Sequence, residues 1–350
     1  MIKIKIGHKT IGENKPIFYI AEAGVNHNGS LAIAKKLINT AKKYGADAIK
    51  FQSFLADEII IPKGPKAKYH DETVGKKTNW YDLLKKQEIS IKMHKFLISY
   101  CKKKQIIFLS TPYDYQSALL LNKLGVNAFK IASTDNNNFP LIEKIVKFRK
   151  PIIISTAMTN FNEVEDIVKF FRKLRFKKYI ILQCTGSYPS KTSDANLRVL
   201  QIYKKKFKCL VGYSDHTPVN TSAIVSVGLG AKVIEKHFTI NKKMWGPDHR
   251  MSLSPKELKK SIQEVRLADT SLGKAKKEVL MCEKENRNKL KKSLVFSRNM
   301  KKYEKIRLSD LKIKRPGTGI GPKLINKVIG LRLKKNIKAN TLIKFASLKK

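Results

Sequence analysis

The sequence lacks any segment that could cross a membrane or direct export. None of its apolar runs approaches the roughly 18 to 20 consecutive apolar residues that a spanning helix needs. The first residues, 1–9, form a short basic run without the apolar core of a signal peptide. We therefore expect a soluble, cytoplasmic protein with no membrane partner.

Cysteine is scarce as well. The chain has four cysteines, and no two of them form a Cys-x-x-Cys pair. Cys184 and Cys209 lie inside apolar runs, where a small buried thiol is common. The spacing therefore predicts neither a disulfide nor a zinc cluster.

Acidic residues are few: 27 Asp and Glu stand against 73 Lys and Arg, which gives a formal charge of +46. Such an excess could indicate a face that binds nucleic acid. The lysines, however, recur on the polar faces of predicted helices, as at Lys35, Lys36 and Lys42, and no DNA- or RNA-binding motif accompanies them. We expect a solvated basic surface that attracts polyanions weakly at low salt, and no specific nucleic-acid partner.

What the sequence does contain is an alternation of short apolar or β-branched runs with amphipathic helical stretches. This alternation builds parallel α/β sheets, and eight repeats predict a closed TIM (β/α)8 barrel. The predicted strands are residues 17–22, 48–52, 106–110, 128–132, 151–155, 179–184, 210–214 and 233–237.

The length of 350 residues accommodates a barrel of roughly 250 residues and one small module. Near residue 283 the pattern changes to short strand-like pieces at 293–297 and 311–313. We therefore predict a barrel domain over residues 1–282 and a small C-terminal domain over residues 283–350.

Helix signals fall between the predicted strands. Ser30 can cap a helix that follows the first strand, and Ser254 with Glu257 forms a capping box that opens the helix after the eighth strand. Residues 53–88 are too many for a simple connection, and we predict a loop over the active face.

Two lysines are predicted to point into the barrel. Lys50 alternates with Ile49 and Phe51, which would pack on the helices, and Lys130 has the same position in its strand. An inward lysine needs either an internal carboxylate or an anionic ligand. A ligand is favoured, because neither lysine has an acidic neighbour on its own strand and both lie near strand C-termini, where barrel enzymes place their sites.

Glu22, His216 and His237 end three strands that are consecutive in a closed barrel, so their side chains should converge. Two imidazoles with a nearby carboxylate suit a divalent metal such as manganese, iron, cobalt or zinc. Alternatively, one histidine is a satisfied core residue or a general base. The histidines expected on the surface or in loops are His8, His70, His94 and His249.

Hydroxyl side chains follow five of the predicted strands, and several such donors beside a lysine favour a phosphate ester. The sequence has no P-loop and no Gly-x-Gly-x-x-Gly turn, so a nucleotide is not indicated. The hydroxyls are those of Ser110, Thr111, Ser133, Ser155, Thr156, Thr185 and Ser214.

Taken together, these motifs resemble the sialic acid synthase family, which includes N-acetylneuraminate, legionaminate and pseudaminate synthases. The matching stretches keep the family order over nearly the whole chain. They are AEAGVNHNGS at 21–30, KFQ at 50–52, STPY at 110–113, KIAS at 130–133, STAM at 155–158, CT at 184–185, YP at 188–189, GYSDHT at 212–217, EKHFT at 235–239, GPDH at 246–249 and KRPG at 314–317.

The resemblance implies a synthase that condenses phosphoenolpyruvate with an N-acetylated amino sugar. N-acetylmannosamine is the first expected acceptor, as in N-acetylneuraminate synthase. The alternatives are a 2,4-diacetamido-2,4,6-trideoxy-mannose, as in N,N'-diacetyllegionaminate synthase, and a sugar phosphate, which would need a second phosphate site within residues 53–88. A module of another class, which binds polyanions without catalysis, also stays open.

The family also implies a divalent metal, Mn²⁺ first and Mg²⁺ or Co²⁺ as alternatives, held by His216 and His237. It implies an antifreeze-like (SAF) C-terminal domain and a domain-swapped homodimer in which Arg315 reaches the sugar's N-acetyl group in the other subunit. Phosphoenolpyruvate would be bound by Lys50, Thr111, Lys130, Ser133, Ser155 and Ser214. Sugar binding or catalysis would fall to Glu22, Tyr188, Glu235 and Asp248.

Two positions depart from the family pattern. Asp135 stands where many members have glutamate, and Gly186 stands where some have asparagine or serine. Both positions face the sugar in the family, with Asp135 as a sugar-binding candidate, so they bear on which sugar is accepted. The GPDH and RPG runs are closer to the neuraminate and legionaminate branches than to the pseudaminate branch.

Overall fold

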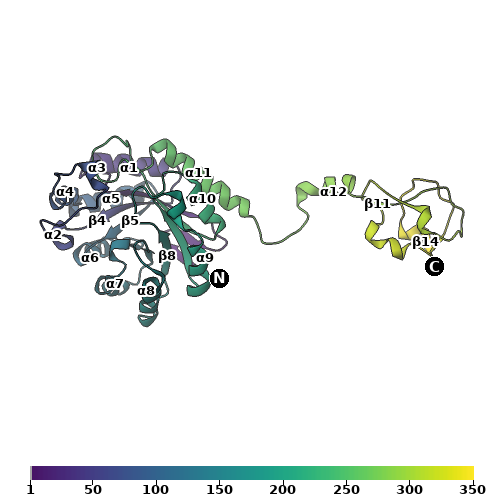
Figure 1. Ribbon diagram of the computed structural model, residues 1–350, viewed down its shortest axis with the longest axis horizontal. Coiled ribbons are helices and arrows are strands. Elements are labelled where there is room, and N and C mark those ends of the chain that lie inside the picture. The colour runs from purple at the N-terminus through teal and green to yellow at the C-terminus, as the bar shows by residue number, and fades with distance from the viewer. Residues whose placement is uncertain (1) are drawn as a thin grey trace. The chain divides into compact units, whose positions relative to one another are not determined.

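The computed structural model describes residues 2–350, which divide into two compact units, Met1–Gly273 and Lys274–Lys350 (Figure 1). The domain boundary predicted between residues 282 and 283 falls a few residues inside the second unit. Within residues 2–350 no helix is long and apolar enough to cross a bilayer.

The first unit is built on an eight-stranded parallel sheet whose order is β5-β4-β3-β10-β9-β8-β7-β6. The outer strands β5 and β6 also contact each other, so the sheet curls into a TIM-barrel-like cylinder. All eight predicted strands are therefore confirmed. They are β3 (Phe18–Gly24), β4 (Ala48–Ser53), β5 (Ile107–Pro112), β6 (Phe129–Ile131), β7 (Ile152–Ser155), β8 (Tyr179–Cys184), β9 (Leu210–Asp215) and β10 (Val233–His237).

Helices follow the strands and surround the sheet (Figure 1). Ser30 caps α1 by accepting a hydrogen bond from the amide of Ile33, and Ser254 and Glu257 form the expected capping box at α11. Both predicted helix starts are confirmed. The helices are α1 (Leu31–Lys43), α5 (Ile91–Lys103), α6 (Tyr115–Lys123), α7 (Phe139–Val146), α8 (Phe161–Lys173), α9 (Val199–Phe207), α10 (Thr221–Gly228) and α11 (Pro255–Leu272).

Strand alternation separates two apolar layers. Ile49 and Phe51 of β4 pack in the large core between sheet and helices, whereas Ala48 belongs to a smaller cluster inside the barrel. The N-terminal hairpin of β1 (Lys3–Ile6) and β2 (Lys9–Gly12) adds Ile6 and Ile11 to this inner cluster, beside the first residues of the strands. The hairpin therefore closes the amino end of the barrel and leaves the carboxyl end for a site.

Residues 54–88 are more ordered than the predicted loop, because they form three short helices. These are α2 (Ala56–Ile59), α3 (His70–Val74) and α4 (Trp80–Gln87). Leu84 of α4 packs with Val25 and Phe54 in a small separate apolar cluster. This cluster fixes the segment beside the loop that follows β3.

The second unit has its own apolar core, which includes Leu294, Val328 and Ile343. Two small antiparallel ladders surround it, one between β11 (Ser293–Phe296) and β12 (Leu311–Lys314) and one between β13 (Arg332–Leu333) and β14 (Leu348–Lys349). The exposed helix α12 (Lys284–Leu290) precedes the ladders. The strand-like pieces predicted at 293–297 and 311–313 are thus confirmed.

The packing of the barrel interior predicts the effect of one substitution. A Cβ added at Gly212 would lie 2.8 Å from the Val233 Cβ and closer still to the Val233 carbonyl oxygen. Because backbone cannot move aside as a flexible side chain can, Gly212→Ala should lower the free energy of unfolding of the barrel by about 1–3 kcal/mol. Denaturant unfolding followed by tryptophan fluorescence measures this loss.

The matched control is Gly228→Ala at the end of α10, where an added Cβ meets no atom within 4 Å. Alanine favours the helix over glycine, so this variant should unfold at the wild-type midpoint or slightly above it. An equal loss of stability in both variants would contradict the packing argument.

Candidate active site

A cavity of about 640 Å³ opens at the carboxyl end of the barrel strands. Thirteen predicted site residues of the barrel line it, although they are spread over more than two hundred positions of the chain, whereas the strand-end hydroxyls of Ser110, Thr156 and Thr185 do not. The thirteen residues are Glu22, Lys50, Thr111, Lys130, Ser133, Asp135, Ser155, Tyr188, Ser214, His216, Glu235, His237 and Asp248.

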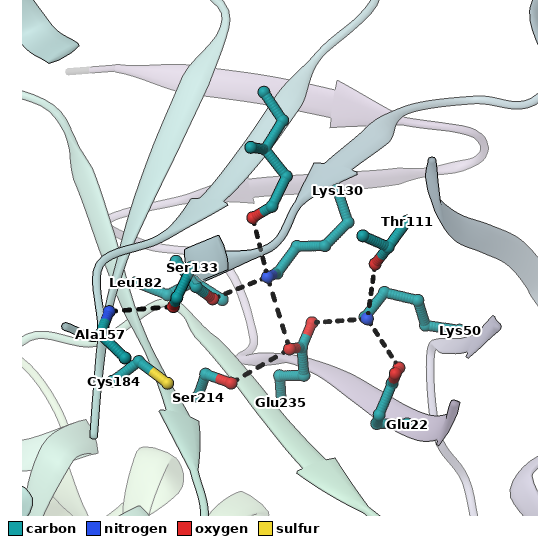
Figure 2. A network of polar contacts seen from close by, with 12 residues as sticks. Glu22, Lys50, Thr111, Lys130, Ser133, Ala157, Leu182, Cys184, Ser214 and Glu235 are labelled. Atoms are coloured by element: carbon teal, nitrogen blue, oxygen red, sulfur yellow. Dashed lines mark hydrogen bonds and ion pairs between the residues drawn. The ribbon is translucent and has the colours of Figure 1, made fainter. Parts of the chain in front are cut away.

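The floor of the cavity is a network of buried charges (Figure 2). The Lys50 Nζ lies 2.8 Å from Glu22 Oε2, 3.8 Å from Glu235 Oε2 and 2.9 Å from the Thr111 hydroxyl. Burial lowers the pKa of Lys50, but Glu22 and Glu235 outweigh burial, and the net pKa is raised. Lys50 therefore stays charged.

Lys130 sits on the other side of Glu235. Its Nζ donates to the Ser155 hydroxyl at 2.6 Å and to the Ile131 carbonyl at 3.1 Å, and it lies 3.7 Å from Glu235 Oε1. Burial is the main cause that lowers the pKa of Lys130, and the charge of Lys50 adds to the lowering. Glu235 thus lies between two ammonium groups.

The sequence favoured an anionic ligand over internal carboxylates as the partner of the two lysines, and these contacts correct that prediction. Both ammonium groups have an internal carboxylate partner, which comes from another strand. Glu22 of β3 stands opposite Lys50 of β4 in the strand register, and Glu235 reaches both lysines from β10. Inspection of each lysine's own strand could not reveal these partners, whereas the register between strands does.

The two buried carboxyl groups differ in their protonation. Burial raises the pKa of Glu22 to about 7, with Lys50 opposing the rise and Glu235 adding to it. Burial also acts on Glu235, but Lys130 and Lys50 outweigh it and lower its pKa, and the Ser214 hydroxyl donates to Glu235 at 3.0 Å. Near neutral pH, Glu22 can hold a proton while Glu235 is ionised.

His216 and His237 come together as predicted, with ring centroids 5.6 Å apart. The ring nitrogen Nδ1 of His216 lies 2.8 Å from the Thr185 carbonyl, which fixes the proton on Nδ1 and leaves Nε2 unprotonated in the neutral ring. His237 Nδ1 lacks a hydrogen-bond partner within residues 2–350 and lies 4.0 Å from Asp248 Oδ2. Glu22 is the neighbour of His237 in the strand register, but its carboxylate turns to Lys50.

The histidine pair has donors that suit a metal ion. Burial holds the pKa of His237 well below its usual range, so its imidazole is neutral and its lone pair is available. Within residues 2–350 no group of three or more His, Cys, Asp or Glu side chains has the spacing of a complete ligand set. The pair therefore offers two imidazole donors to an ion, which is fewer than a complete set of protein ligands.

An aromatic chain reaches the site from residues 54–88. The rings of Trp80 and His70 are 4.2 Å apart, those of His70 and Tyr69 4.1 Å, those of Tyr69 and Tyr188 5.2 Å, and those of Tyr188 and His216 4.1 Å. The prediction that His70 lies on the surface is therefore wrong. Tyr69 and Trp80 also line the cavity and were missed, since nothing in the local sequence shows which loop residues fold back over a site.

Other expectations for single residues meet mixed outcomes. His94 is buried within α5, contrary to the prediction of a surface or loop position, and bonds to Ser53. His249 lies in a loop, as one of the two predicted alternatives has it, but is buried there and bonds to Thr239. His8 is exposed as predicted. All four cysteine thiols are free, as predicted.

Cys184 is buried as predicted, but it also lines the cavity, with Sγ 3.7 Å from His216 Nδ1.

Arg315 belongs to the second unit, where it lines a groove with Lys314, Lys334, Lys335 and Lys344.

Comparison with known proteins shows the family of the chain. The family model described as "NeuB family" matches residues 37–277, and the SAF domain model matches residues 291–349. Among curated proteins, the chain is 43% identical over 332 residues to an N,N'-diacetyllegionaminic acid synthase of Campylobacter jejuni, covering 94% of this chain and 99% of the relative. It is 39% identical to the enzyme of the same name from Legionella pneumophila, covering 96% of each chain.

Solved structures give the same result. The crystal structure of N-acetylneuraminic acid (sialic acid) synthetase from Leptospira borgpetersenii in complex with citrate has a TM-score of 0.72 at 34% identity, covering 81% of this chain and 95% of that chain. The spore coat polysaccharide biosynthesis protein SpsE of Bacillus subtilis has a TM-score of 0.68 at 33% identity, covering 100% and 99%. The chain therefore belongs to the NeuB family of sialic and nonulosonic acid synthases and carries a C-terminal SAF domain.

Proposed function

We propose that this protein condenses phosphoenolpyruvate with an N-acetylated amino sugar and releases phosphate, forming a nonulosonic acid. The observation that carries the proposal is the cavity floor, where two buried ammonium groups lie among hydroxyl donors and beside a pair of histidines. The names of the relatives support the same reaction class.

The lysine side of the cavity is the proposed site for phosphoenolpyruvate. Lys50 and Lys130 would balance its phosphate and carboxylate charges, and the hydroxyls of Thr111, Ser155 and Ser214 would donate to its oxygens. Uptake of a proton by Glu22, whose pKa is already about 7, would remove one negative charge as the anion enters.

The histidine side is the proposed site for a divalent metal, Mn²⁺ first, with Mg²⁺ or Co²⁺ as alternatives. His216 and His237 would hold it with Asp248 nearby. When bound, the ion would act as a Lewis acid toward the aldehyde oxygen of the open-chain sugar.

In the proposed reaction the enol carbon of phosphoenolpyruvate bonds to the aldehyde carbon of the sugar, and the aldehyde oxygen takes up a proton. Water then adds to the carbon that bears the phosphate and loses one proton. The bond between this carbon and the phosphate oxygen breaks, and the remaining hydroxyl proton passes to the departing phosphate, which leaves a ketone. The contrast in pKa favours Glu22 as the proton donor to the aldehyde oxygen and the ionised Glu235 as the acceptor of the proton from water.

For the sugar, we favour a 2,4-diacetamido-2,4,6-trideoxy-mannose. The support comes from two relatives that are named N,N'-diacetyllegionaminic acid synthase. They are 43% and 39% identical to this chain, and the matches cover nearly their whole length. N-acetylmannosamine is the second candidate, because the sialic acid synthetase of Leptospira has the same fold at 34% identity.

A phosphorylated sugar is disfavoured. It would need cations from residues 54–88, and none of the side chains that this described segment contributes to the cavity is Lys or Arg. The Lys66 ammonium donates to the carbonyl groups of residues 75, 76 and 78 and pairs with Asp71, so it does not reach the cavity.

The role of Arg315 stays a prediction. We propose a homodimer in which Arg315 of one subunit contacts the N-acetyl group of the sugar bound to the other. The support is the family resemblance and the position of Arg315 in a basic groove of the SAF unit.

Removal of the metal tests the histidine side. Treatment with a chelator should abolish phosphate release from phosphoenolpyruvate and an acceptor sugar, and added Mn²⁺ should restore it. His237→Ala should stay inactive with Mn²⁺ while its far-UV circular dichroism is unchanged, because only a neutral donor is lost. His8→Ala, at an exposed histidine, is the control and should respond like the wild type. Full activity after chelation would remove the metal from the mechanism.

The choice of sugar is tested by supplying each acceptor with phosphoenolpyruvate and Mn²⁺ and identifying the ketoacid by mass spectrometry. We expect kcat/KM for the diacetamido sugar to exceed that for N-acetylmannosamine by at least about tenfold, since a missing contact group commonly costs that much. Arabinose 5-phosphate should give no product. A preference for N-acetylmannosamine would establish the second candidate. Salt-sensitive nucleic-acid binding without phosphate release would instead favour a polyanion-binding module.

A further inference from the structure

A buried ion pair lies directly behind the two histidines, on the face of the barrel wall that packs against the helices. Strand alternation turns Ser214 and Glu235 into the cavity, so their neighbours Asp215 and Lys236 point the other way. Asp215 is 1% exposed and Lys236 3%. Elsewhere this face carries side chains such as Ile49 and Phe129, which pack in the apolar core.

The ammonium group of Lys236 is fully engaged. It donates to Asp215 Oδ2 at 2.5 Å, to the Thr217 carbonyl at 2.8 Å and to the Val219 carbonyl at 3.2 Å. The other oxygen of Asp215 accepts from the amide of Thr217 at 2.8 Å and from its hydroxyl at 2.7 Å. The pair therefore binds the backbone directly after His216, at Thr217 and Val219.

The position of these contacts matters because the β-ladder ends here. Asp215 and Lys236 are the last partners in the register between β9 and β10, so the ladder does not hold His216 itself. The His216 ring must nevertheless reach the Thr185 carbonyl at 2.8 Å and lie beside His237. Beyond the ladder, Lys236 is the group that ties the loop of residues 215–219 to the strand that carries His237.

A buried ion pair by itself adds little to the free energy of unfolding. Desolvation of both charges offsets their attraction, and apolar side chains of similar size often serve as well or better. Hydrogen bonds that orient a ligand side chain, in contrast, commonly change metal affinity or activity by about 10- to 100-fold. We infer that Lys236 and Asp215 are positioning residues, which hold His216 in place for the reaction at the histidine side. This inference rests on the proposed function.

The test separates positioning from stability. Lys236→Met leaves the carboxylate of Asp215 buried without its partner and should lower both the unfolding midpoint and activity. The double variant Asp215→Asn with Lys236→Met removes both charges, while the amide oxygen can still accept from Thr217. We expect the double variant to regain most of the unfolding midpoint, yet to keep a kcat and a Mn²⁺ affinity reduced by about tenfold or more.

The matched control is Asp47→Asn with Arg266→Met, which removes an ion pair at the amino end of the barrel, far from the site. It should shift the unfolding midpoint and leave kcat and Mn²⁺ affinity at wild-type values. Mn²⁺ affinity is measured by electron paramagnetic resonance without substrates, so it reports on the histidines independently of turnover.

Turnover by the wild type tests the proposed function, and the variants test whether Lys236 and Asp215 position His216. A wild type that binds Mn²⁺ but converts no acceptor sugar would refute the function, whereas reduced Mn²⁺ affinity in the double variant would still support positioning. Recovery of kcat and Mn²⁺ affinity together with the unfolding midpoint would overturn positioning. If the double variant does not fold, Asp215→Asn alone serves, with a smaller loss of Mn²⁺ affinity expected and an unchanged affinity counting against the inference.

Discussion

One carboxylate shared by two lysines organises the interior of this barrel. Glu235 lies 3.8 Å from the Lys50 ammonium and 3.7 Å from that of Lys130, so a single carboxylate is within ion-pair distance of both buried cations. Glu22 then becomes the fourth charge of a crowded set, and burial raises its pKa to about 7. When Glu22 is protonated, the floor of the cavity carries one excess positive charge. An interior held together in this way is stable without a ligand and attracts an anion.

Much of this arrangement was predictable from the sequence, because the evidence for it is local. The period of two in each strand shows which side chains point inward, and Ser30 and Ser254 mark helix starts. The ionic partners of Lys50 were not predictable in the same way, since they depend on the register between strands, where a shift of one residue would turn Glu22 to the other face. The short helices of residues 54–88 gain their order from packing, which the sequence does not display.

The two halves of the site have different structural origins. Strands and their ends supply the lysines and the carboxylates of the floor. An aromatic wall is formed by the loop residues Tyr69 and Tyr188 and by Trp80 at the start of α4. Loops tolerate change more readily than barrel strands do.

The N-terminal hairpin has a kinetic consequence. Because Ile6 and Ile11 close the amino end of the barrel, ligands reach the cavity from the carboxyl end. A ligand seated on the lysines must pass the aromatic wall before a second ligand occupies the space above it. In the proposed reaction, phosphoenolpyruvate would therefore enter first and the sugar second, and phosphate formed at the bottom would leave after the ketoacid has vacated the mouth.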